Sequence, residues 1–327
     1  MMMDIFRLAR PEIIAMKAYS SARNTASADG ILLNANEAPE THLDDPEWAR
    51  LEINRYPAPQ PEALRSRFAA MYGVVEENLL ITRGSDEGID LLTRVFCRAG
   101  QDAIVECSPC FGMYRIAATI QGAEVIDVPR QSAPGFAIDF NQLVDQIRAD
   151  DRVKLVFLTS PSNPTGDLVE EADLLRVLKA CKDRALVVMD EAYVEFSDAP
   201  SAVKLVKSYP QLVVLRTLSK AWAAAGVRCG SVIASPDIIN LLLRVIAPYP
   251  LSVTAIVAAL RAISEEAQSR QKAFLEEVAQ TKANFLDFLA SCDWLEVVGD
   301  QQANFVLVRV DEANRLVKDR KSTRLNS

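Results

Sequence analysis

Three segments decide the fold of this chain: KLVFLTSPSNPTG (154–166), ALVVMDEAY (185–193) and QLVVLRTLSK (211–220). Each begins with an apolar run rich in Val, Leu or Phe and ends in a polar cluster. Apolar runs of this length, separated by segments with a helical pattern, are typical of buried parallel strands in successive βαβ units. We therefore predict an α/β fold, with a large, mostly parallel sheet and helices on both of its faces.

The polar clusters place three chemically distinct side chains at similar intervals. Asn163 precedes Asp190 by 27 residues, and Asp190 precedes Lys220 by 30 residues, which is about the length of one βαβ unit. An amide, a carboxylate and an amine should therefore lie together at the C-terminal edge of one sheet. Open α/β sheets bind their ligands at that edge.

Composition and charge exclude several other classes of protein. The chain has 327 residues, half of them hydrophobic, and a net charge of −8, which argues against nucleic-acid binding. We find no apolar run of membrane-spanning length and no signal peptide in residues 1–10. The six cysteines are scattered, as in a protein of the reducing cytoplasm. The single histidine, His42, argues against a multi-histidine metal site, and we expect no metal.

Cys107 and Cys110 have a spacing that serves zinc binding and redox chemistry. A structural zinc ion needs four ligands, and the sequence has no second cysteine pair or histidine cluster. A thioredoxin-type dithiol remains an alternative, although the surrounding chain is much longer and differently ordered. We interpret the spacing as coincidental.

A possible anion site lies where a predicted strand (78–82) meets a predicted helix (88–98). The connection, Arg83-Gly84-Ser85-Asp86-Glu87, contains a glycine turn. Backbone N–H groups at such a helix start, together with the helix dipole, attract a phosphate group. The alternative is an ordinary helix capped by Ser85 or Asp86.

The strand-end residues suggest a specific cofactor. Asp190 closes an apolar strand, and we expect Lys220 to be partly desolvated, which favours the neutral, nucleophilic amine. A lysine that forms a Schiff base, a carboxylate that holds a pyridine nitrogen protonated and a helix start that binds phosphate are what pyridoxal phosphate requires. A structural ion pair between Asp190 and Lys220 is the simpler alternative.

These residues carry a resemblance to a known family. SPSNPTG (160–166), DEAY (190–193) and TLSKAWAAAGVRCG (217–230) resemble blocks of the class I and II aminotransferases of fold type I. The resemblance is narrowed to the histidinol-phosphate aminotransferases by four further blocks: NANE (34–37), NRYPAPQP (54–61), GSDE (84–87) and CFGMY (110–114). It runs in order from about residue 19 to residue 317.

The resemblance implies pyridoxal 5′-phosphate as cofactor and assigns roles in catalysis. Lys220 would form the Schiff base and then move the substrate proton. Asp190 would pair with the pyridine nitrogen, and Asn163 and Tyr193 would bond to the phenolic oxygen of the cofactor. Phe111 would stack on the ring. The resemblance thus implies Lys220, Asp190 and Tyr193 as the catalytic residues.

The resemblance also implies how the phosphate group and the substrate are bound. Tyr56 would reach the phosphate group from a neighbouring subunit, which implies a homodimer with shared active sites. Tyr19, Asn36 and Tyr56 match positions near the substrate. Four further residues would hold the phosphate group: Ser85, Asp86, Ser219 and Arg228.

The predicted domains follow the change of pattern near residues 248–254. We expect a large cofactor-binding domain over 46–250 and a smaller α+β domain over 251–319, with a long helix (254–291) and strands at 295–298 and 304–310. Residues 1–45 should pack with the small domain. Residues 320–327 have no helical or strand pattern where relatives continue, so we expect a non-native or disordered tail and an incomplete small domain.

The implied reaction is amino transfer between L-histidinol phosphate and 2-oxoglutarate, giving imidazole-acetol phosphate and L-glutamate in histidine biosynthesis. The same fold could instead act on an aromatic or aspartate-type amino acid, or decarboxylate a phosphorylated amino acid. A third alternative is a protein that binds the cofactor without catalysis, because its small domain is incomplete. The partners expected in each case are small molecules, with no nucleic acid and no membrane.

Overall fold

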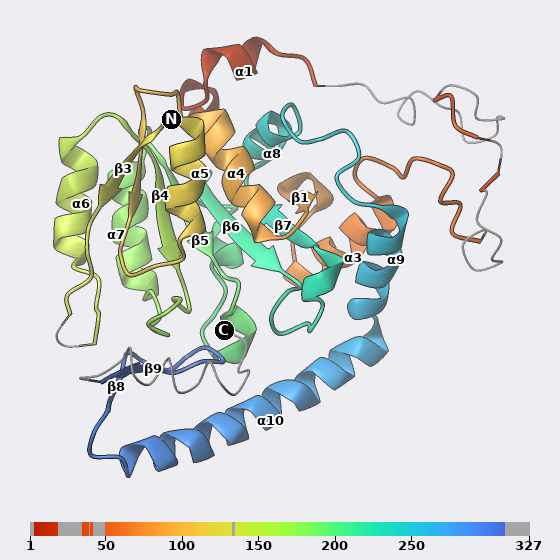
Figure 1. Ribbon diagram of the computed structural model, residues 1–327. Coiled ribbons are helices and arrows are strands. Elements are labelled where there is room, and N and C mark those ends of the chain that lie inside the picture. Colours follow the sequence, from red (N-terminus) through yellow and green to blue (C-terminus); the bar gives the residue numbers. More distant parts are fainter. Residues whose placement is uncertain (1–2, 19–34, 39, 42–49, 133–134, 311–327) are drawn as a thin grey trace.

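The computed structural model describes residues 3–18, 35–38, 40–41, 50–132 and 135–310. At its centre lies a seven-stranded sheet with the strand order β1-β7-β6-β5-β4-β2-β3 and helices on both faces (Figure 1). The strands have the following bounds: β1 Leu79–Thr82, β2 Ala103–Glu106, β3 Glu124–Asp127, β4 Val153–Thr159, β5 Leu186–Asp190, β6 Leu212–Thr217 and β7 Gly230–Ile233. The α/β prediction is confirmed.

The segments 154–166, 185–193 and 211–220 contribute three neighbouring strands. β4, β5 and β6 pair in parallel, with Thr159 opposite Asp190 and Asp190 opposite Leu215. β2 and β3 continue the parallel part of the sheet, whereas β7 is antiparallel to both β6 and β1. The last residues of β4 and β5 therefore lie side by side at one edge.

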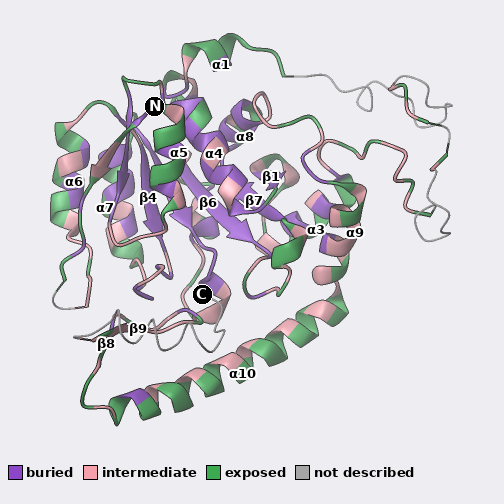
Figure 2. Ribbon diagram, viewed as in Figure 1, coloured by how far each residue is buried: buried purple, intermediate pink, exposed green. Residues whose placement is uncertain are grey.

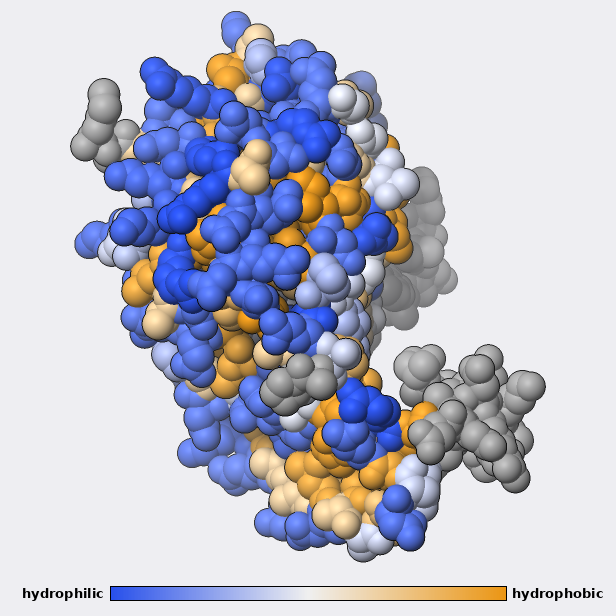
Figure 3. All heavy atoms as spheres, turned by 90° about the vertical axis from the view of Figure 1, so that its left-hand side faces the viewer, coloured by the Kyte–Doolittle hydropathy of each residue, from blue (hydrophilic) through white to orange (hydrophobic). Residues whose placement is uncertain are grey.

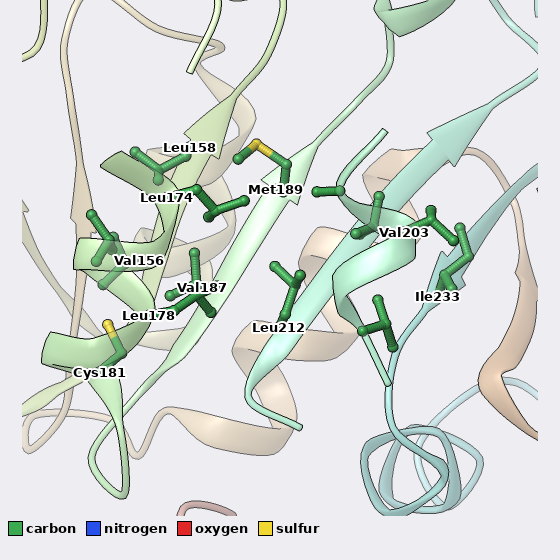
Figure 4. Packing of buried hydrophobic residues seen from close by; sticks show 14 of the residues in the cluster. Val156, Leu158, Leu174, Leu178, Cys181, Val187, Met189, Val203, Leu212 and Ile233 are labelled. Carbon is green, nitrogen blue, oxygen red and sulfur yellow. The ribbon is translucent and has the colours of Figure 1, made fainter. Parts of the chain in front are cut away.

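Successive residues of each strand point to opposite faces of the sheet, and each face has its own core. On one face, Val156, Leu158, Val187 and Met189 pack against Leu174 and Leu178 (Figure 4). The helices of this face are α3 Glu62–Tyr72, α6 Phe140–Ala149, α7 Glu171–Cys181 and α9 Val253–Ala262.

The opposite face is covered by a second set of helices. Leu155, Phe157 and Val188 point to this side and belong to the second buried cluster. The helices that contribute to it are α4 Ser85–Phe96, α5 Met113–Gln121 and α8 Pro236–Leu242. Short 3₁₀ turns complete this part of the chain: η3 Glu76–Asn78, η4 Val194–Phe196, η5 Ala202–Leu205 and η6 Ala225–Val227.

The predicted long helix is interrupted near its start. α9 ends at Ala262, and α10 spans Glu265–Ala290. The Ser264 hydroxyl accepts a hydrogen bond from the N–H of Ala267 and so caps a new helix. After α10 come β8 (Glu296–Val298) and β9 (Leu307–Arg309), which form a separate antiparallel pair. β9 is shorter than the predicted strand over 304–310.

The described part of the N-terminal segment differs from the expectation. η1 (Ile5–Arg7) and α1 (Pro11–Ala15) pack with α4 and α8 on the large sheet, and not with α10, β8 or β9. Ile5 is fully buried there, and the Arg10 N–H donates to the Val95 carbonyl. Burial of its apolar side chains holds this segment on the large sheet. Among the described helices, none combines the length and apolar character needed to cross a bilayer.

Candidate active site

A cavity of about 170 Å³ opens at the C-terminal edge of β4, β5 and β6. Nine of the ten residues predicted to bind the cofactor line it. They are Ser85, Asp86, Phe111, Asn163, Asp190, Tyr193, Ser219, Lys220 and Arg228. Larger hollows of about 740 and 880 Å³ lie beside Trp222, but neither Asp190 nor Lys220 lines them. The small cavity is therefore where the predicted chemistry converges.

Asp190 forms the buried end of this cavity, with an exposed fraction of 2%. Its Oδ1 accepts the N–H of Ala192 at 3.1 Å, and its Oδ2 accepts the hydroxyl of Tyr114 at 2.8 Å. Burial raises the pKa of Asp190 to about 6, although these two hydrogen bonds and the charge of Lys220 act in the opposite direction. The carboxylate is thus desolvated but well anchored.

Tyr114 was not predicted as a site residue. It lies on α5, fully buried, and its hydroxyl also lies 2.8 Å from the Thr159 hydroxyl. One feature of the sequence could have indicated its role. Tyr114 shares the buried face of α5 with Ala117 and Ala118, and a buried phenol requires a hydrogen-bond partner. The identity of that partner could not be read from the sequence.

Lys220 follows the end of β6 by three residues and is exposed, so the expected desolvation is wrong for this structure. The loop carries the side chain beyond the apolar strand, where water reaches it. Its Nζ lies 5.3 Å from the centre of the Tyr193 ring. The Tyr193 hydroxyl accepts a hydrogen bond from Asn163 Nδ2 at 3.2 Å. Amine, phenol and amide thus form one wall of the cavity.

Another part of the cavity lining is built on the start of α4. Its N-cap residue is Gly84, with φ of 81°, and no side chain caps the helix, so the alternative of a cap by Ser85 or Asp86 is wrong. The first N–H groups of a helix have no partners within the helix. Arg228 lies beside them, with Nη2 at 3.2 Å from Asp86 Oδ2 and Nη1 at 3.4 Å from Ser219 Oγ.

Glycine is required beside the start of α4 by close packing. A Cβ atom on Gly84 would lie 3.0 Å from Arg228 Nη2, and one on Gly230 would lie 2.7 Å from the backbone of Gly84. The two glycines let β7 approach the start of α4 closely, so that Arg228 reaches the end of the helix.

An ionic network behind the cavity joins the strand of Asp190 to the loop of Lys220. Arg216 binds Glu191 at 3.2 Å and Glu195 at 2.8 Å. The Trp222 indole N–H donates to the same Glu195 oxygen at 3.1 Å. Burial raises the pKa of Glu191, whereas Arg216 lowers it. Sequence patterns assigned no role to these residues, because the contacts depend on pairing between β5 and β6.

The predicted ring-stacking and substrate residues are placed differently from one another. Phe111 lines the cavity edge-on to Tyr114, with ring centres 5.8 Å apart. Tyr56 does not line it and stacks on Tyr249 at 4.4 Å. Asn36 is exposed and also lies outside the lining, and Tyr19 falls outside the described residues.

The Cys107 and Cys110 thiols are poor candidates for redox chemistry. Burial raises the pKa of each to about 12, and the thiolate is the reactive form of cysteine. Within the described ranges, no group of three or more His, Cys, Asp or Glu residues is arranged to hold a metal ion.

The comparisons with known proteins agree with this geometry. The family described as aminotransferase class I and II matches residues 28–324. The chain belongs to this family. A relative from Vibrio parahaemolyticus, named histidinol-phosphate aminotransferase, is 43% identical over 95% of this chain and 88% of its own length. A relative of the same name from Xanthomonas euvesicatoria is 44% identical over 95% of this chain and 85% of its own length.

Solved aminotransferases of this kind share the fold. The structure of histidinol-phosphate aminotransferase from Sinorhizobium meliloti, in complex with pyridoxal-5′-phosphate, superposes with a TM-score of 0.77 at 22% identity, covering 85% of this chain and 75% of the other. L-threonine-O-3-phosphate decarboxylase from Porphyromonas gingivalis gives a TM-score of 0.69 at 24% identity, covering 83% and 79%. Proteins named for different activities thus share the aminotransferase fold.

Proposed function

We propose that this chain is a pyridoxal-phosphate-dependent aminotransferase that converts L-histidinol phosphate and 2-oxoglutarate to imidazole-acetol phosphate and L-glutamate, a step of histidine biosynthesis. The observation that carries the chemistry is the convergence of Asp190, Asn163 and Lys220 on one cavity. Support for the substrate comes from relatives above 40% identity that are named histidinol-phosphate aminotransferases and match about 95% of this chain.

The donor set of the cavity fits pyridoxal phosphate. A buried carboxylate lines the cavity, and so do a helix start, an arginine and a serine. An amine and a phenol lie on the wall near Asn163. This arrangement suits an elongated molecule with a basic ring nitrogen, an aldehyde beside a phenolic oxygen, and a phosphate group.

When bound, pyridoxal phosphate supplies an aldehyde that exchanges amino groups and a ring that withdraws electrons from the substrate Cα. Lys220 Nζ would hold the cofactor and then carry the proton at the substrate Cα. Asp190 would accept the N–H of the protonated ring nitrogen. Asn163 and Tyr193 would donate hydrogen bonds to the phenolic oxygen, and Phe111 would cover one face of the ring.

The phosphate group would be held at the start of α4. The backbone N–H groups of Ser85 and Asp86 and the hydroxyl of Ser219 would donate to its oxygens, and the dipole of α4 favours negative charge there. Arg228 would have to bind both the phosphate group and Asp86, which is its present partner. Sharing one guanidinium between two anions is compatible with its five N–H donors.

We further propose a cytoplasmic homodimer with shared active sites. Tyr56 and Asn36 lie outside the cavity of their own chain, as expected if Tyr56 serves the neighbouring subunit. The six cysteines are free, which suits a reducing compartment. We also retain a domain boundary near residues 248–254, between the large sheet and the part that contains α10, β8 and β9.

The role of Lys220 can be tested by trapping. Protein loaded with pyridoxal phosphate and reduced with borohydride should carry the added mass on the peptide that contains Lys220. Lys220→Ala should bind the cofactor reversibly and carry no added mass, whereas Lys204→Ala, which removes an exposed lysine paired with Glu171, should label like the wild type. Labelling of Lys220→Ala at the wild-type level would refute the proposal.

The substrate can be tested by single-turnover kinetics. Histidinol phosphate should convert the loaded protein faster than phenylalanine or aspartate does, and each turnover should yield one glutamate when 2-oxoglutarate follows. Release of carbon dioxide from a phosphorylated amino acid would favour the decarboxylase alternative, which the shared fold of the Porphyromonas gingivalis enzyme supports. Cofactor binding without any amino transfer would favour the inactive alternative.

A further inference from the structure

Asp190 is held by a buried hydrogen-bonded pair, Tyr114 and Thr159, to which the family resemblance assigned no role. Tyr114 Oη lies 2.8 Å from Asp190 Oδ2 and 2.8 Å from Thr159 Oγ1. The three residues come from α5, β5 and β4, and each is no more than 3% exposed. The Tyr114 ring is stacked on Phe157, with ring centres 4.6 Å apart. The phenol is therefore held in place from two sides.

The direction of these hydrogen bonds follows from the number of protons. An ionised carboxylate only accepts, and a tyrosine hydroxyl has one proton to donate. When Asp190 is ionised, Tyr114 must donate to Asp190, and so Thr159 must donate to Tyr114. A chain of donors thus ends on the carboxylate. Such a chain stabilises the charged form of Asp190 against its burial.

We propose that Tyr114, oriented by Thr159, is a positioning residue that keeps Asp190 ionised and directed into the cavity before the cofactor binds. This proposal rests on the proposed function and deepens it, because an ionised Asp190 is the form that can accept the N–H of a protonated ring nitrogen. The main-chain N–H of Ala192 holds the other carboxylate oxygen, so Tyr114 controls the second one.

The groups around Asp190 act in both directions. Asp86 on α4 favours the protonated form, whereas Lys220 favours the ionised form. Arg228 and Tyr193 line the same cavity from its other sides. Burial raises the pKa of Asp190 to about 6, close to neutrality. Loss of the Tyr114 donor should therefore leave a large part of Asp190 protonated at neutral pH.

The consequence can be measured in the binding of pyridoxal phosphate. Cofactor affinity should fall on the acid side once free Asp190 becomes protonated, because the extra proton must then be released on binding. The second pKa of a phosphate group is also about 6, so the cofactor adds its own pH dependence. Asp190→Asn keeps that dependence and lacks the contribution of Asp190, and it serves as the baseline.

The experiment measures the dissociation constant of pyridoxal phosphate between pH 5 and pH 9 by fluorescence, for the wild type and four variants. The acid limb is the part of the curve in which affinity falls as the pH is lowered. Relative to Asp190→Asn, the acid limb of Tyr114→Phe should move up by about one to two pH units, as expected for loss of a hydrogen bond to a charged group. On the acid side of both midpoints, this shift corresponds to a roughly ten- to hundred-fold loss of affinity. Thr159→Val should move the acid limb less, because Thr159 acts through Tyr114.

Tyr72→Phe is the matched control. It removes another tyrosine hydroxyl, from a partly buried side chain that does not line the cavity; this hydroxyl lies 3.4 Å from Ser231 Oγ. Its acid limb should coincide with that of the wild type. If Tyr114→Phe fails to fold by circular dichroism, Thr159→Val decides: an upward shift supports the proposal and an unchanged limb refutes it.

The role of Tyr114 and the proposed function can be refuted separately. If the wild type binds pyridoxal phosphate but Tyr114→Phe leaves the acid limb unmoved, the role of Tyr114 is refuted and the proposed function stands. The same holds if Tyr72→Phe moves the limb equally, since the effect would then not be specific. If the wild type does not bind pyridoxal phosphate, the proposed function is refuted and this proposal with it.

Discussion

The large sheet and the segment from α10 to β9 differ in how far their apolar side chains are buried. All residues of β5 and β6 are buried, whereas α10 has 26 residues and only Leu289 is buried (Figure 2). Phe288 is 60% exposed, and Trp294 is 55% exposed. Figure 3 shows hydrophobic side chains at the lower end of the molecule, the end at which α10 and β8 lie in Figure 1.

This difference in burial indicates that the two regions contribute differently to the candidate site. Asp190 and Asn163 lie at or just beyond the ends of strands that are covered on both faces, so the core of the large sheet fixes their positions. The segment from α10 to β9 meets the cavity lining between its two strands, where Ala303 packs with Ala192 and Tyr193, and Phe305 lies edge-on to Tyr193 at 5.2 Å. The site should therefore depend on the sheet for its geometry and on the α10 region for its surroundings.

The largest effect expected from this difference is on stability. Phe157→Ala removes a side chain that is 2% exposed and stacked on Tyr114, and it should lower the free energy of unfolding by about 3–5 kcal/mol. Phe288→Ala, the same change on α10, should lower it by less than about 0.5 kcal/mol. Urea unfolding followed by circular dichroism measures both values, and equal losses would remove the distinction between the regions.

A second test concerns the charge that the sheet buries. The pKa of Asp190 is raised from 3.8 to about 6, so the stability it contributes is full below about pH 4 and is lost as the pH rises through about 6. From pH 4 to pH 7, the cofactor-free wild type should lose about 2–2.5 kcal/mol relative to Asp190→Asn. Urea midpoints at several pH values measure this, and a constant difference would show that Asp190 is not desolvated.

A third test concerns close packing beside the start of α4. Gly230→Ala should cost about 1–3 kcal/mol, because the new methyl group would meet the backbone of Gly84 and Arg216 at 2.7 Å. Gly226→Ala is the matched control, since no atom lies within 4 Å of its Cβ position. Thermal unfolding should shift for the first variant only. A tolerated Gly230→Ala would mean that β7 and α4 can separate freely.

The smallest effect is expected on the surface of α10. Arg270 forms an ion pair with Glu266, one turn away, and both side chains are largely exposed. Arg270→Gln should change the free energy of unfolding by less than about 0.5 kcal/mol, and the change should shrink further in high salt. Urea unfolding at two salt concentrations checks this. A larger loss would indicate that α10 is held more firmly than its exposure suggests.

The sequence predicted those features of the site that depend on strand order. Apolar runs that end in Asn163, Asp190 and Lys220 are sufficient to place three groups at one sheet edge, because parallel strands joined by helices present the same ends. The glycine turn at Gly84 likewise predicted a helix start beside this edge. These features follow from local composition and from the connection rules of α/β folds.

The remaining features depend on contacts between distant parts of the chain. The hydrogen bond from Tyr114 to Asp190 joins residues 76 positions apart, and periodicity alone does not reveal it. The exposure of Lys220 depends on the path of the loop after β6. The division between α9 and α10 depends on Ser264, a capping residue within an otherwise continuous helical pattern.

The ionic network around Arg216 has a consequence for how such a site diversifies. Glu191 is the neighbour of Asp190 in the chain, Trp222 follows Lys220 by two residues, and Arg216 and Glu195 connect them. A displacement of Asp190 should therefore be transmitted to Lys220, and the reverse, through these contacts. We therefore expect evolutionary changes in substrate choice to accumulate at the rim of the cavity and to leave Asp190 and Lys220 unchanged. Substitutions at the rim can alter which substrate binds without disturbing the contacts that connect Asp190 to Lys220.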